Sequence, residues 1–68
     1  MKFKYDDYVI VTRGFYKGLE GKVKGIEENS FFLGNQVFDK YYFEGLHGNN
    51  NVKTFILETD LKLNEKLK

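Results

Sequence analysis

Short segments in which apolar and polar residues alternate run along most of this chain, with glycines between them. An alternation with a period of two is typical of β-strands, because successive side chains point to opposite faces of a sheet. The first strand is expected over residues 7–12. It would place Val9 and Val11 on one face and Tyr8 and Ile10 on the other.

A second strand is expected over residues 21–28, after a polar and aromatic surface loop at residues 13–18. Its apolar anchors, Val23 and Ile26, are three residues apart, so strict alternation fails here. Because Gly25 lies between them, we expect a β-bulge at this point. The bulge would return Ile26 to the same inner face as Val23.

The rest of the chain shows the same pattern and no helical period. Further strands are expected over residues 31–33, 37–43, 52–57 and 61–63, with a tight turn at 28–30, another at 34–35 and a loop over 45–51. Five or six short strands at this spacing predict an all-β fold, a small antiparallel barrel or sandwich. Full closure of a barrel would also remove exposed strand edges.

Length and composition narrow the function classes. With 68 residues and 8.0 kDa, the chain is expected to form a single domain spanning residues 1–68. The absence of cysteine excludes a disulfide scaffold and a thiolate metal site. No apolar run reaches the roughly 20 residues that span a bilayer, and the N-terminal residues lead into acidic ones. We therefore expect no membrane association and a cytoplasmic location.

A pattern of valines, glycines and a lysine within residues 6–27 resembles the KOW motif. The matching residues are Asp7, Val9, Val11, Gly14, Lys17, Gly18, Gly21, Val23 and Ile26. This resemblance implies a small barrel of the Src-homology-3-like type, as found in ribosomal proteins and transcription-elongation factors. Asp6 departs from the pattern, because a glycine often precedes the aspartate in the family, and the change affects the entry turn.

Positive charge is concentrated near this motif although the whole chain carries a formal charge of only +1. Residues 13–24 hold four basic side chains and one acidic side chain, which gives +3. The predicted nucleic-acid-binding residues are Arg13, Phe15, Tyr16, Lys17, Lys22 and Lys24. Cations bind phosphate and rings stack on unpaired bases, so this surface predicts a module that binds RNA or DNA.

Other interpretations of the same residues stay open. Lys22 and Lys24 alternate with Val23, so they also fit the solvent face of an ordinary strand. Phe15 and Tyr16 could fold back and close one end of the barrel. The loop would then be structural, or it would bind a protein.

The twelve aromatic residues exceed what the interior of so small a barrel can hold. Neighbours on a strand point to opposite faces, so some rings among the consecutive aromatics should be exposed. The predicted protein-interface residues are Phe32, Tyr41, Tyr42 and Phe43. They suggest a protein partner or a homodimer, unless a bulge or a turn buries all of the rings.

Catalytic and metal-binding chemistry is not expected. His47 is the single histidine and Ser30 the single serine, so neither a metal-ligand set nor a catalytic triad is predicted, and no cofactor is expected. The sequence predicts a non-enzymatic nucleic-acid-binding module. The alternative is a protein-interaction module, for instance a small phage-encoded regulator or inhibitor of a larger nucleic-acid-processing protein.

Overall fold

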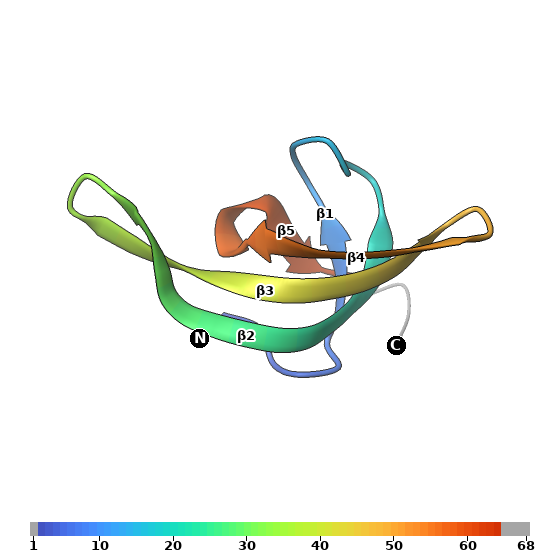
Figure 1. Ribbon diagram of the computed structural model, residues 1–68, viewed down its shortest axis with the longest axis horizontal. Coiled ribbons are helices and arrows are strands. Elements are labelled where there is room, and N and C mark those ends of the chain that lie inside the picture. The colour runs from blue at the N-terminus through green and yellow to red at the C-terminus, as the bar shows by residue number, and fades with distance from the viewer. Residues whose placement is uncertain (1, 65–68) are drawn as a thin grey trace.

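The computed structural model describes residues 2–64, and its regular secondary structure is β-strand apart from one short 3-10 helix. The elements in chain order are β1 (Tyr8–Val11), β2 (Glu20–Leu33), β3 (Gln36–His47), β4 (Asn50–Leu57), the short 3-10 helix η1 (Glu58–Asp60) and β5 (Leu61–Leu63). The strands form one antiparallel sheet in the order β4-β3-β2-β1-β5, which curves around the core (Figure 1). The expected all-β class and the lower of the two expected strand counts are confirmed.

The sheet is not closed into a barrel, so the expectation of full closure is wrong. Within residues 2–64, β4 and β5 are the two edges of the sheet, and no strand pairing joins them. The chain leaves β4 through η1, and β5 then pairs with β1 at the other edge of the sheet. The backbone N–H of Thr12 donates to the Asp60 carbonyl at 2.7 Å, which fastens η1 to the end of β1. The result is consistent with a small Src-homology-3-like fold.

The core lies inside the curve of the sheet. Its buried residues are Phe3, Val9, Val11, Leu19, Val23, Tyr41, Phe43, Ile56 and Leu61, with Tyr16, Ile26 and Val52 packed against them. The expected inner face of Val9, Val11 and Val23 is confirmed. The expected bulge is also confirmed, because the register between β2 and β3 shifts between Val23 and Gly25. This shift brings Ile26 opposite the buried Tyr41.

The tight turn expected at residues 28–30 is wrong, because β2 continues through it as one strand of 14 residues. The polar residues instead form a second irregularity in the register, between Glu27 and Phe31. Asn29 adopts a left-handed backbone conformation, with φ of 53°, and its N–H donates to Asp39 Oδ1 at 2.9 Å. Asparagine tolerates this conformation, which occurs in turns as well. The same residues can therefore form either a turn or an irregularity within a strand.

The loop expected over residues 45–51 is also wrong in extent. Strand β3 continues to His47, and the reversal takes only the two residues before β4 begins at Asn50. Gly48 has a φ of 65° in this turn. Gly45 is not a turn residue but a strand residue, paired with Gly21 of β2.

Gly21 and Gly45 leave space for the ring of Phe43, which is fully buried. A Cβ added at Gly21 would lie 2.8 Å from Phe43 Cζ and 2.7 Å from the Cα of Gly45. A Cβ added at Gly45 would also lie 2.8 Å from Phe43 Cζ. Because packed cores resist added volume, both positions require glycine.

We expect Gly21→Ala to destabilise the fold by about 2 kcal/mol, which lowers Tm by roughly 10 °C in a domain of this size. Thermal unfolding followed by circular dichroism measures the shift. Gly25→Ala is the matched control, because its Cβ would meet only the Tyr42 Cβ at 3.3 Å. Equal losses of stability in both variants would contradict the role of the Gly21–Gly45 pair.

Candidate nucleic-acid interface

The loop between β1 and β2, residues 12–19, forms a compact turn held by its own backbone. Gly14 and Gly18 have φ of 91° and 93°, a region that glycine enters freely. The N–H of Lys17 donates to the Gly14 carbonyl at 3.2 Å, and the N–H of Gly18 donates to the Val11 carbonyl at 2.8 Å. The two glycines of the motif therefore let the chain reverse sharply and present the residues between them.

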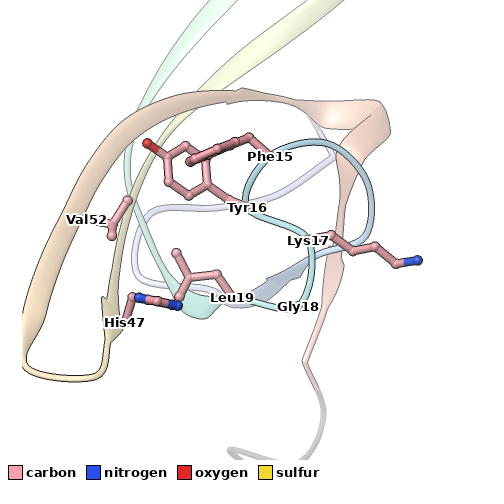
Figure 2. Close-up of a pocket in the computed structure, with 7 residues that line it drawn as sticks. All are labelled: Phe15, Tyr16, Lys17, Gly18, Leu19, His47 and Val52. Carbon is pink, nitrogen blue, oxygen red and sulfur yellow. The ribbon is translucent and has the colours of Figure 1, made fainter.

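An open groove of about 470 Å³ lies between this loop and the hairpin that joins β3 to β4. Its lining residues are Phe15, Tyr16, Lys17, Gly18, Leu19, His47 and Val52 (Figure 2). Leu19 is buried beneath it, and Val52 packs against the core. The groove, called the loop groove below, therefore combines an apolar floor with polar groups at its edges.

Phe15 and Tyr16 have different roles in the loop groove. Tyr16 packs against the core, which agrees with the interpretation that it helps to close one end of the sheet. Phe15 is 91% exposed and touches the Tyr16 ring edge to face, with centroids 5.0 Å apart and planes at 90°. The faces of the Phe15 ring are therefore available to a ligand.

Two of the cations predicted for the site lie in or beside the loop. Lys17 is exposed and its side chain extends away from the loop groove (Figure 2). Arg13 is engaged within the protein, because its Nε lies 3.2 Å from Asp60 Oδ1 and its terminal nitrogen donates to the Thr59 carbonyl at 3.3 Å. Of these two cations, Lys17 is thus the one without an ion pair among residues 2–64.

The other two predicted cations lie on the outer face of β2. The Lys22 Nζ lies 4.8 Å from the centre of the Tyr8 ring, and the Lys24 Nζ lies 5.3 Å from the centre of the Tyr5 ring. Both tyrosines lie at the start of β1 or before it, whereas the loop follows the end of β1 (Figure 1). The six predicted residues therefore occupy two separate surfaces rather than one continuous edge.

Sequence reasoning missed two groups of residues near these surfaces. Tyr5 and Tyr8 were not predicted for the outer surface. The alternation in β1 already places Tyr8 on that face. The sequence does not show, however, that Tyr8 pairs with Lys22. His47 and Val52 come from a distant hairpin, and only the fold brings them to the loop groove.

The predicted protein interface is partly wrong. Tyr41 and Phe43 are completely buried, because their side of β3 faces the core. The Tyr41 hydroxyl also accepts hydrogen bonds from the N–H groups of Lys2 and Phe3, at 2.9 and 3.1 Å. Tyr42 is half-buried on the outer face, and Phe32 is 68% exposed. Only these last two remain candidates for an interface.

Residues 2–64 contain no cluster of three or more metal-ligating side chains of the His, Cys, Asp or Glu type. No helix in this part of the chain is long and apolar enough to cross a membrane. His47 is one of the residues that line the loop groove.

An ion pair joins the entry turn to β2. The Lys24 Nζ donates to Asp6 Oδ1 at 2.7 Å, and Asp6 has a φ of 70°. The hydrogen bond with Lys24 lowers the pKa of Asp6, and the same bond raises the pKa of Lys24. Asp6 thus holds, in the left-handed region, the position where the family often has a glycine.

We expect Lys24→Gln to raise the pKa of Asp6 back toward the range of a free aspartate, which a pH titration followed by NMR of the carboxyl carbon would measure. Because the folded pKa of Asp6 is lowered, its contribution to stability is present above the unfolded pKa and is lost as pH falls through the folded value. Asp6 is exposed and Lys24 is only half-buried, so the stability change should be small. An unchanged Asp6 titration in the variant would disprove the pairing in solution.

Comparisons with known proteins agree with this geometry. The family model of the KOW motif matches residues 6–39, which is 34 of the 68 residues and covers the entry turn, β1, the loop and β2. The motif is generally associated with nucleic-acid and ribosomal-protein binding. No curated protein and no solved structure matches the chain. With half of its length matched and the strand, loop and glycine geometry in place, the chain belongs to the KOW-motif family.

Proposed function

We propose that this protein binds single-stranded nucleic acid, with an unpaired base seated at the loop groove. The observation that carries the proposal is the exposure of Phe15, at 91%, beside a groove with an apolar floor. Base stacking on an aromatic ring is tolerant of sequence, because every base has a flat face. The proposal agrees with the general association of the KOW motif with nucleic acid.

The geometry of the two rings supports stacking. Tyr16 packs against the core and contacts the Phe15 ring, so Phe15 is supported from one side while it stays exposed to water. An exposed phenylalanine gains little for the free protein, since its apolar surface is not removed from water. A base that covers this ring and rests against Leu19 and Val52 would bury that surface.

The positively charged side chains allow only a few contacts to phosphate groups. Lys17 at the loop and Lys22 on the outer face are the two predicted cations without an ion pair among the described residues. Arg13 and Lys24 would first have to leave Asp60 and Asp6. With a formal charge of only +1, we expect modest affinity with a shallow dependence on salt.

We also propose that the protein acts by binding rather than by catalysis. The loop groove brings together aromatic and aliphatic side chains with one histidine, and no acid–base pair accompanies that histidine in the lining. A protein-binding role is supported by a different surface, the exposed apolar tip of the β2–β3 hairpin.

The first test of the proposal replaces the exposed ring. We expect Phe15→Ala to weaken binding of a labelled twelve-nucleotide strand, either oligo(U) or oligo(dT), about tenfold, within the range expected for the removal of one base–ring stack. Fluorescence anisotropy at about 50 mM salt, where binding to phosphate is strongest, measures the affinity. Phe32→Ala is the matched control, because Phe32 is an exposed phenylalanine far along β2. Equal effects of both substitutions, or no binding by the unaltered protein, would refute the proposal.

The second test measures the salt dependence. Removing one cation that touches a phosphate should reduce the slope of log K against log salt by about 0.7 for a single strand. We expect Lys17→Gln and Lys22→Gln each to show this reduction. Lys40→Gln is the control with the same change in charge, because Lys40 already forms an ion pair with Glu27 at 3.6 Å. A reduction in the control alone would place the nucleic acid elsewhere.

A further inference from the structure

A long β-hairpin, called the hairpin arm below, extends from the body of the protein and comprises residues 27–40. The pairs between β1 and β2 end at Lys22, and the pairs between β4 and β3 begin at Lys40. Apart from Lys40 at its base, which pairs with Leu57 of β4, the hairpin arm is therefore flanked by no third strand within residues 2–64. It accounts for one end of the longest dimension of the molecule, 38 Å against 23 and 17 Å (Figure 1).

The hairpin arm is apolar on both faces at its tip. Phe31 pairs with Phe38, with ring centroids 6.4 Å apart, and Phe32 pairs with Val37. Because neighbours on a strand alternate between faces, these two pairs lie on opposite faces of the ribbon. Leu33 follows on the face of Phe31. The ten residues 29–38 contain no charged side chain.

The tip is exposed but is too small to hold two copies of the protein together. Phe31, Phe32, Leu33 and Val37 are 38, 68, 62 and 46% exposed, which amounts to an area on the order of 400 Å². A stable interface buries about 800 Å² on each partner. Two ribbons laid against each other would cover only one face of each. A partner that covers this surface must therefore enclose both faces.

The base of the hairpin arm is acidic. Glu27, Glu28, Asp39 and Glu58 lie there with one cation, Lys40, so the carboxylates exceed the ammonium groups by three. Glu58 Oε1 accepts the N–H of Asp39 at 2.8 Å, which holds these two residues side by side. This charge repels phosphate and anionic lipid and attracts a basic surface.

We propose that the hairpin arm is a docking element that inserts its tip into an apolar cleft of a larger protein whose rim is basic. An uncharged wedge with rings on both faces fits a cleft, since both faces become buried at once. The acidic base then meets the basic rim and orients the insertion. This surface shares no residue with the loop groove, so the docking proposal can fail or succeed independently of nucleic-acid binding.

The experiment uses the full chain with p-benzoyl-phenylalanine at position 32, expressed and illuminated in its native host. The adduct is mapped by mass spectrometry, and the captured protein is purified for affinity measurements. We expect the mapped site to be an apolar cleft flanked by lysine or arginine. We expect Phe32→Ser combined with Leu33→Ser to weaken binding to the purified protein at least thirtyfold. Phe15→Ala should leave that affinity unchanged.

A second variant and further outcomes keep the test decisive. Glu27→Lys with Glu28→Lys, both exposed positions, should weaken binding about tenfold and make it less sensitive to salt. The tip variant should keep the Tm of the unaltered chain, because the tip lies outside the core. The base variant should change the Tm little, because the exposed Glu27–Lys40 ion pair that it removes contributes little to stability. An adduct only with a second copy, with nucleic acid or with lipid overturns the proposal. No adduct, or a captured protein whose affinity the tip variant does not change, also overturns it.

Discussion

The contact of the Phe43 ring with the Gly21–Gly45 pair is the constraint on which the rest of this sheet depends. It brings the backbones of β2 and β3 together beneath a large buried side chain. That approach sets the register of the two longest strands, and this register places Val23 and Tyr41 in the core. Gly21 also pairs with Val9 of β1 and Gly45 with Val52 of β4, so the two glycines link four neighbouring strands.

Local patterns predicted those parts of the fold in which one strand alone carries the information. The alternation around Val9 and Val11 and the three-residue gap at Gly25 were sufficient for the inner face and the bulge. The same reasoning failed at Gly45 and Asn29, because glycine and asparagine are common in turns as well as at close strand contacts and irregularities. Whether such a residue lies in a turn or within a strand depends on the partner strand. The pattern of one strand alone does not contain this information.

The candidate site shows the same division. Phe15 and Lys17 are presented by a loop whose two glycines can be recognised from the sequence alone. Strand pairing, in contrast, separates Lys22 and Lys24 from that loop, and ion pairs engage Arg13 and Lys24. In the sequence the four cations are equivalent candidates for binding phosphate. In the folded protein two of them are held in ion pairs among residues 2–64 and two are not. The four cations therefore do not form one broad basic surface.

The hydroxyl group of Tyr41 has a practical consequence for any preparation of this protein. It binds the backbone of Lys2 and Phe3, and the Phe3 side chain, 2% exposed, packs edge to face on the Tyr41 ring. Phe3 thus belongs to the interior, and the backbone of Lys2 is fastened to it. Trimming them during cloning would uncover an aromatic side chain and leave a phenol oxygen unsatisfied, so shortened versions should begin no later than Lys2.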